Sequence, residues 1–303
     1  MFSSTCPIVL AGMNPVSDVN LAVACSNAGM TPTLCGFIYY RHGALNNELF
    51  EAGLKEYVVR ASNSSVIPSL DGKDMKNTQT LDILTKYNIK FVELIEGVDQ
   101  DSWPEIQKIC KKSNITPIIK VLYHTEILDG FEVIMLKGGE GAGRGNKNMS
   151  LLETFETIKQ LYPLIKIIVS GGIGTGAEVE QYIDRGAVAV AIGTLFAASE
   201  ESSISLTAKQ KIVDATIDNL VRLGKAQQNA LVFSPVNNDD FNNTKSIRLG
   251  IKSGTDGHVF LGQAVNQVNK IESVAQILFN LLKGTRYEQN TSNVVAISFP
   301  YLQ

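Results

Sequence analysis

The stretch KIIVSGGIGTG, residues 166–176, places a short apolar run directly before a cluster of glycines. The β-branched residues of this run predict a strand that is buried on both faces, as in a parallel sheet. A strand that ends in consecutive glycines and leads into a helix exposes backbone N–H groups. Together with the helix dipole, these groups can bind a phosphate. We therefore expect Gly171 and Gly172 to lie in a phosphate-binding turn.

A second turn of this kind occurs in the sequence AIGT, residues 191–194. Gly193 allows a ligand to approach the backbone closely, and Thr194 adds a hydroxyl group. Turns after the seventh and eighth strands form the phosphate site of many barrel enzymes, so the pair favours such a site over simple tight turns. A dinucleotide-binding fold is disfavoured because no strand followed by GxGxxG begins the chain.

Short apolar runs alternate with longer amphipathic stretches over most of the chain. The runs predicted as strands are Pro7–Ala11, Thr31–Leu34, Ser65–Leu70, Lys90–Ile95, Pro117–Leu122, Glu132–Leu136, Lys166–Val169 and Val188–Ile192. The stretches predicted as helices are Ser17–Ala28 (with Ser17 as its cap), Met75–Tyr87, Trp103–Lys112, Ser150–Leu161 and Gly176–Arg185. This order predicts an α/β protein with a (β/α)8 TIM barrel and a small helical cap after strand 8. A doubly wound open sheet is the alternative.

The predicted division of the chain follows from the end of the eighth strand. We expect the barrel core in residues 1–203, the helical cap in residues 204–268, and a C-terminal helix and tail packing on the barrel in residues 269–303. Within the cap, Leu206–Leu223 is predicted as a long helix and the polar stretch Val236–Thr244 as a loop. Ile271–Leu282 is predicted as the last helix.

Composition excludes several classes of protein. The chain has 303 residues, of which 44% are hydrophobic and 19% charged, so it is not a disordered chain. A net charge of -3 without a broad basic field argues against nucleic-acid binding. No apolar run approaches the roughly 18 residues that a membrane span needs. The first six residues contain no Lys or Arg, so they lack the charged start of a signal peptide.

Cysteines and histidines are few and scattered. The four cysteines form no CxxC pair, so neither a zinc knuckle nor a disulfide scaffold is indicated, and a reducing cytoplasmic location is expected. The three histidines His42, His124 and His258 form no metal-binding pattern, so no metal is expected. His124 follows the fifth strand, where catalytic side chains of barrels lie, and His258 could reach the site from the cap. The alternative for His124 is a loop or helix-start residue, and His42 is expected to be solvated.

Two further segments indicate contact with a flat ligand. The sequence KGGEGAGRG, residues 137–145, has five glycines in nine residues, so it can form neither a stable helix nor a stable strand. Such a backbone lets a ligand lie against it, although a mobile surface loop is the alternative. The first strand ends in Ala11, Gly12 and Met13, where small residues would let a planar ring approach the main chain.

In their order along the chain these motifs resemble the nitronate monooxygenase (2-nitropropane dioxygenase-like) family of FMN-dependent TIM barrels, which is related to flavin enoyl-acyl-carrier-protein reductases. The matching segments are Pro7–Asn14 (family PIIQAPM), Leu21–Gly29 (the next helix), Glu140–Arg144 (EAGGH), Ser170–Ile173 (AGGI), Gly193–Thr194 (MGT) and Gly262–Gln263 (a late GQ segment). The paired phosphate turns occur in many barrels, but the ordered set is more specific.

The resemblance implies FMN as cofactor. The residues it places at FMN are Ala11, Gly12 and Met13 near the isoalloxazine ring, Glu140 and Gly143 in the glycine-rich loop, and Gly171, Gly172, Gly193 and Thr194 at the phosphate. It also implies that Lys120, on the fifth strand, lies near flavin N1 and O2, where a fixed cation would stabilise the anionic reduced ring. An ion pair at the rim is the alternative for Lys120.

The chain departs from the family pattern at two places. Arg144 stands where the family has the histidine expected to remove a proton from a nitronate or nitroalkane. Arginine stays protonated and cannot act as this base, but it can bind an anionic substrate, so Arg144 and His124 are the candidate catalytic residues. In the third strand, VIPSL at residues 66–70 stands where the family has GVNL, so the asparagine contact with flavin is missing or replaced.

These interpretations predict an FMN-dependent oxidoreductase that oxidises alkyl nitronates or similar small substrates. One alternative is a flavin-dependent enzyme similar to enoyl-acyl-carrier-protein reductase. A second is a non-catalytic barrel that binds FMN or a phosphorylated ligand and has lost the family histidine. The expected partner is a small-molecule substrate, without nucleic acid or membrane, and a homodimer is left open.

Overall fold

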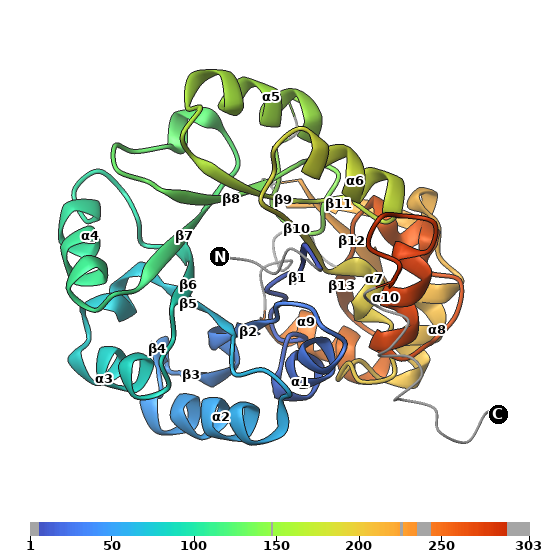
Figure 1. Ribbon diagram of the computed structural model, residues 1–303. Helices are drawn as coiled ribbons and strands as arrows, with labels where there is room; N and C mark the ends of the chain where they lie inside the picture. The colour runs from blue at the N-terminus through green and yellow to red at the C-terminus, as the bar shows by residue number, and fades with distance from the viewer. Residues whose placement is uncertain (1–5, 147, 225–226, 235–243, 290–303) are drawn as a thin grey trace.

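The computed structural model describes residues 6–146, 148–224, 227–234 and 244–289. Figure 1 looks down a ring of eight parallel strands that is surrounded by helices. The strands of the ring are β1 Ile8–Leu10, β2 Thr33–Cys35, β5 Ile67–Asp71, β6 Phe91–Glu96, β7 Thr116–Val121, β8 Val133–Lys137, β9 Lys166–Ser170 and β10 Ala189–Ile192. All eight predicted strands are therefore present, and the predicted TIM barrel is confirmed.

The ring closes between the first two strands. Hydrogen bonding runs in the order β1-β10-β9-β8-β7-β6-β5-β2. The remaining gap is bridged next to β2, because the Leu10 N–H donates to the Thr31 carbonyl at 2.9 Å and the Thr31 N–H donates to the Ile8 carbonyl at 3.1 Å. The alternative of an open doubly wound sheet is therefore wrong.

Helices outside the ring follow the predicted pattern with two additions. The helices of the barrel are α1 Val19–Asn27, α2 Asn47–Arg60, α3 Thr78–Lys86, α4 Trp103–Lys112, α5 Leu151–Leu161, α6 Gly176–Asp184 and α7 Thr194–Ala197. Helix α2 and the short helix α7 were not predicted, and neither was the hairpin of β3 (Tyr40–Arg41) and β4 (Ala44–Leu45) that precedes α2. Although α2 is polar overall, Phe50, Leu54 and Tyr57 bury one side of it.

The inside of the barrel changes from apolar to polar toward the carboxyl ends of the strands. The buried apolar cluster contains, or packs against, Ile67, Phe91, Ile118, Met135 and Ile168. Residues two positions apart in a strand point to the same face. The residues two positions farther along these strands are Ser69, Glu93, Lys120, Lys137 and Ser170. They therefore form a polar layer at the end of the barrel where barrel enzymes place their active sites.

The segment after β10 contains a small sheet as well as helices, so the expectation of a purely helical cap is incomplete. An antiparallel sheet of β11 (Leu220–Leu223), β12 (Gln228–Val232) and β13 (His258–Phe260) lies beside α8 (Leu206–Val213) and α9 (Thr244–Ser253). The predicted helix Leu206–Leu223 is wrong beyond Val213, because its last four residues pair with β12. Pairing between distant strands outweighs local helix preference here.

The last helix, α10 (Val274–Leu282), packs against α1 and α7. Residues 236–243 of the predicted loop and residues 290–303 of the predicted tail lie outside the described residues. Among the residues that the structure describes, no helix is both long and apolar enough to cross a membrane.

Candidate active site

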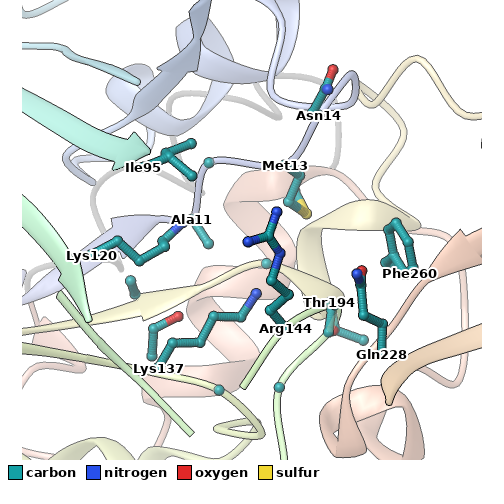
Figure 2. A pocket seen from close by; sticks show the side chains of 18 of the residues that line it. Ala11, Met13, Asn14, Ile95, Lys120, Lys137, Arg144, Thr194, Gln228 and Phe260 are labelled. Atoms are coloured by element: carbon teal, nitrogen blue, oxygen red, sulfur yellow. The ribbon is translucent and has the colours of Figure 1, made fainter. Parts of the chain in front are cut away.

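A cavity of about 490 Å³ opens at the carboxyl ends of the barrel strands. Its volume lies within the roughly 300–1,000 Å³ range of small-molecule sites. It is lined by the turns after β1, β9 and β10, by the glycine-rich loop after β8, and by cap residues from α9, β12 and β13. The predicted cofactor residues that line it are Ala11, Gly12, Met13, Lys120, Gly143, Gly171, Gly172, Gly193 and Thr194. Figure 2 shows part of this lining, with side chains from the barrel on one side and from the cap on the other.

The two glycine turns meet at one side of the cavity. Strand pairing sets Ala191 of β10 beside Ser170 of β9, so the turns that follow these strands are neighbours. Gly172 has φ +77, and a Cβ there would lie 2.6 Å from the Glu140 Cβ, so only glycine fits. Gly193 begins the four-residue helix α7. Two such turns and a short extra helix are the usual phosphate site of barrels.

The N-terminus of α6 contributes less to this site than expected. The Glu178 carboxylate accepts the N–H groups of Gly174 and Thr175, both at 2.9 Å, and the Thr175 hydroxyl accepts the Glu178 N–H at 3.3 Å. These amides are therefore already used by a capping box. The turn at Gly171 and Gly172, and not the start of α6, is the part of this segment that faces a ligand.

Replacing Thr175 with alanine is expected to lower the free energy of unfolding by about 1 kcal/mol, because the cap of α6 is lost. Urea denaturation followed by circular dichroism measures this change. Thr175→Ser keeps the hydroxyl and is the matched control. Equal stability of the alanine and serine variants would contradict the role of the cap.

The glycine-rich loop is fastened by the cap. The Asn229 side chain donates to the carbonyls of Gly139 at 3.0 Å and Gly141 at 2.8 Å. Gly262 packs against the same loop, and its N–H donates to the Thr194 hydroxyl at 3.0 Å. The loop is thus held by hydrogen bonds from a distant part of the chain, which disfavours the alternative of a mobile surface loop. The late GQ segment links it to the turn after β10.

Ser17 holds the end of the first strand and is not the cap of α1. Its hydroxyl donates to the Ala11 carbonyl at 2.8 Å and accepts the Met13 N–H at 3.0 Å, while Asp18 caps the helix. Ser17 is fully buried, so these bonds fix the backbone at Gly12. Nearby, burial raises the pKa of the Cys35 thiol to about 12, so this thiol, which does not line the cavity, is disfavoured as a nucleophile.

Three basic side chains line the cavity, from the ends of β7 and β8 and from the glycine-rich loop. Lys120 forms an ion pair of 2.6 Å with Glu93 and also lines the cavity. The pair is buried and does not lie at the rim, and the contact of Lys120 with flavin N1 and O2 stays a prediction. Figure 2 shows the side chains of Lys137 and Arg144 pointing into the same space near Ala11. The site is therefore suited to an anionic ligand.

Other predicted residues lie outside the lining. Glu140 accepts the N–H of Leu151, the first residue of α5, at 3.1 Å and so sits behind the phosphate turns. His124 begins a short 3₁₀ turn, His124–Glu126, and is half-buried but does not line the cavity. His258 is fully buried next to Ser246, with 3.1 Å between the hydroxyl and Nδ1, and stacks edge-on to Phe260, which does line the cavity. His42 is exposed.

Some residues of the site were missed by the sequence analysis. Lys137 directly precedes the glycine-rich loop, and Glu93 follows the inward-facing Phe91 by two positions, so strand alternation could have found both. Gln228 and Phe260 come from the cap sheet, and no local sequence signal indicates that they reach the cavity.

The residues present fit a flavin. A side chain at Gly193 would enter the cavity, since a Cβ there would lie 3.0 Å from the Met13 sulfur. Behind Gly12, which lines the cavity, lie the fully buried side chains of Thr33 and Ser69, and no hydrogen-bond partner for their hydroxyls is found within the described part of the chain. A phosphate turn at one end and unpaired polar groups at the other match a ligand with a phosphate and a polar ring.

Comparison with known proteins supports this assignment. A family model described as nitronate monooxygenase matches residues 75–284, which is more than half of the chain. The structure of FabK from Thermotoga maritima is similar, with 20% identity, a TM-score of 0.76, and coverage of 97% of this chain and 96% of that one. Nitroalkane oxidase from Streptomyces ansochromogenes has 15% identity and a TM-score of 0.74, with coverage of 94% and 97%.

A third structure, the enoyl reductase domain of MlnA from the macrolactin biosynthesis cluster of Bacillus amyloliquefaciens, has 12% identity and a TM-score of 0.64, with coverage of 96% and 93%. At these identities the similar structures show the fold. No curated protein matches the chain in sequence. Because the family model matches more than half of the chain, including most of the barrel, the chain belongs to the nitronate monooxygenase family and is a flavin-dependent oxidoreductase.

Proposed function

We propose that the protein is an FMN-dependent enzyme that oxidises alkyl nitronates or similar small anionic substrates. The observation that carries this proposal is the position of Arg144, whose side chain points into the cavity near Ala11 and Met13. Among the described residues that line the cavity there is no histidine. The site therefore offers a cation for an anionic substrate where its family offers a base.

The shape of the phosphate end supports FMN as the flavin. Behind the phosphate turn, a Cβ on Gly174 would lie 2.9 Å from the Gln267 side chain and 3.1 Å from the Ala264 Cβ. Residues of the cap therefore pack tightly against the turn at Gly174. A flavin that ends at its phosphate, in the turns after β9 and β10, fits this packing.

The chain's own residues bind and orient the substrate. Bound FMN would supply the two-electron oxidation and pass the electrons to dioxygen. Arg144 would hold the negative oxygen atoms of a nitronate through charge-assisted hydrogen bonds. Ile251 and Phe260 of the cap give the cavity an apolar wall that would exclude water and contact an alkyl chain, and Ile95 adds an apolar side chain on the barrel side.

A nitronate needs no base, because it has already lost the proton on carbon. Glu126 is the carboxylate among the described lining residues, and its oxygen accepts the backbone N–H groups of Leu122 and Tyr123. A carboxylate held in this way is poorly placed to remove a proton from a neutral nitroalkane. This arrangement supports nitronates over nitroalkanes as substrates.

A flavin-dependent enoyl reductase is the second candidate function. The apolar wall from the cap would accept an acyl chain, and Arg144 would polarise the oxygen of a thioester. Membership of an enzyme family disfavours the non-catalytic alternative.

The absorbance spectrum of the purified protein is the first test. We expect a flavin band and, after heat release, FMN as the chromophore. The oxidised protein is then mixed in air with nitronates or neutral nitroalkanes, with loss of substrate and oxygen uptake as readouts. The protein photoreduced without oxygen is mixed with enoyl thioesters, and reoxidation of the flavin is the readout, because an enoyl reductase takes its electrons from the reduced flavin. A protein that stays colourless after incubation with FMN would overturn the proposal. Turnover of enoyl thioesters alone would favour the second candidate.

Replacing Arg144 with histidine is expected to add activity on neutral nitroalkanes, because a base would then face the substrate. We expect turnover to rise at least about tenfold, which is below the usual contribution of a general base. Steady-state kinetics with matched flavin content measures the change, and Arg144→Gln is the control without a base. Identical nitroalkane rates in the two variants would argue that residue 144 does not occupy the position of the family histidine.

Location and partners complete the proposal. All four cysteines are buried free thiols, which supports a reducing, cytoplasmic location. The cavity supports a small-molecule substrate as the partner.

A further inference from the structure

A buried ion pair lies at the floor of the cavity. The Lys120 ammonium is 2.6 Å from the Glu93 carboxylate, and the side chains are 15% and 0% exposed respectively. Barrel interiors are ordinarily filled with branched apolar side chains. Burying a carboxylate costs several kcal/mol before its ion pair offsets the cost, so the barrel gains little stability from Glu93. The stability of the fold therefore does not explain why this pair is present.

The second carboxylate oxygen of Glu93 lies behind Gly12, as do the side chains of Thr33 and Ser69. A Cβ on Gly12 would lie 2.9 Å from Glu93 Oε2, 3.2 Å from Thr33 Cγ2 and 3.3 Å from Ser69 Oγ. These three side chains are fully buried, and their oxygen atoms find no hydrogen-bond partner apart from the Lys120 ion pair within the described residues. An unsatisfied buried polar group is destabilising. Lys120 is the member of this group that lines the cavity, so a ligand with acceptor atoms would meet the group there.

The strand order sets this polar group opposite the phosphate turns. Thr33, Ser69, Glu93 and Lys120 come from β2, β5, β6 and β7, whereas the phosphate turns follow β9 and β10. Gly12, which follows β1, lies between this polar group and the phosphate turns. A flavin anchored at its phosphate would therefore reach the polar group with the far end of its ring. The pyrimidine edge, with two carbonyl oxygens and an N–H, matches these partners, and the dimethylbenzene edge does not.

We propose that Glu93 is a positioning residue that holds the Lys120 ammonium at the pyrimidine edge of FMN and offsets its charge, and thereby lowers the reduction potential of the flavin. The inference rests on the proposed function, since it needs bound FMN. A lone lysine would stabilise the negative charge of the reduced ring, and its carboxylate partner opposes this effect. Lys137 and Arg144 also face the cavity, but they are common to all variants compared below.

The test is a charge cycle of three variants: Glu93→Gln, Lys120→Met and the double variant. The readouts are the midpoint potential of bound FMN, measured against reference dyes, and the Kd of FMN for the apoprotein, measured by fluorescence quenching. We expect Glu93→Gln to favour reduced over oxidised FMN by about tenfold, which is roughly 30 mV for a two-electron couple. Lys120→Met should shift the potential in the opposite direction, and the double variant should return close to the wild type.

The outcomes separate the two proposals. A wild-type protein that does not bind FMN overturns the proposed function, and the role of Glu93 with it. If the wild type binds FMN but Glu93→Gln keeps its potential, only the role of Glu93 is wrong. If the role of Glu93 were purely structural, its replacement would weaken the binding of oxidised and reduced FMN equally. If Glu93→Gln does not fold, the difference in midpoint potential between Lys120→Met and the double variant measures the effect of the same Glu93 charge. The double variant is suited to this comparison because it leaves no unpaired ion.

Discussion

Replacing Gly193 with aspartate should abolish flavin retention in a protein that still folds. Gly193 has φ −119, which any residue adopts, so the backbone is not strained by the change. A Cβ at this position would lie 3.0 Å from the Met13 sulfur and 3.4 Å from the Ala11 Cβ, which directs the side chain into the cavity. The carboxylate would then face the phosphate. We expect FMN affinity to fall by about 1,000-fold, or ~4 kcal/mol.

The ratio of flavin to protein after purification and the Kd of FMN for the apoprotein measure this loss. Gly193→Asn is the matched control, because asparagine has the shape of aspartate without its charge. We expect the asparagine variant to bind FMN more tightly than the aspartate variant. Normal flavin content in folded Gly193→Asp protein would show that the turn after β10 does not hold the phosphate.

Replacing Arg144 with glutamine should reduce kcat/KM for an alkyl nitronate by about 10- to 100-fold. This range corresponds to the loss of one charge-assisted hydrogen bond, about 1.5–3 kcal/mol. Because the bond is made to the substrate itself, the loss should appear mainly as a higher KM. Steady-state kinetics at saturating oxygen, with flavin content measured in the same samples, tests the expectation.

Arg144→Lys provides the control for charge. Lysine keeps the positive charge but lacks the planar fork of the guanidinium group, so its kcat/KM should lie between the wild type and the glutamine variant. If the glutamine variant has the wild-type KM, Arg144 does not bind the substrate, although it points into the cavity.

The barrel could be predicted because its signals are local. Each strand is a short run of apolar residues, and each turn of the phosphate site directly follows its own strand. Helix α2 was missed because it is polar overall, although Phe50, Leu54 and Tyr57 have helical spacing. The cap sheet could not be predicted, because Leu220–Leu223 becomes a strand only by pairing with β12.

The same distinction applies to the candidate site. The turns and the glycine-rich loop were found because glycine clusters stand out in the sequence. Glu93 lies within the otherwise mostly apolar strand FVELIE, residues 91–96, where a carboxylate looks like an exposed side chain until its neighbours are known. Its pairing with Lys120 depends on the register of β6 and β7, which the sequence does not encode locally. The roles of all these residues stay predictions.

The hydrogen bonds from Asn229 to the glycine-rich loop have a consequence for biosynthesis. A ribosome releases all eight strands of the ring before it releases β12 and the segment at Gly262, which fasten the loop and the turn after β10. Domains generally fold from the N-terminus during synthesis, so the nascent barrel forms with an unfinished mouth. The loop and the turn after β10 are therefore fastened only after translation has passed Gly262.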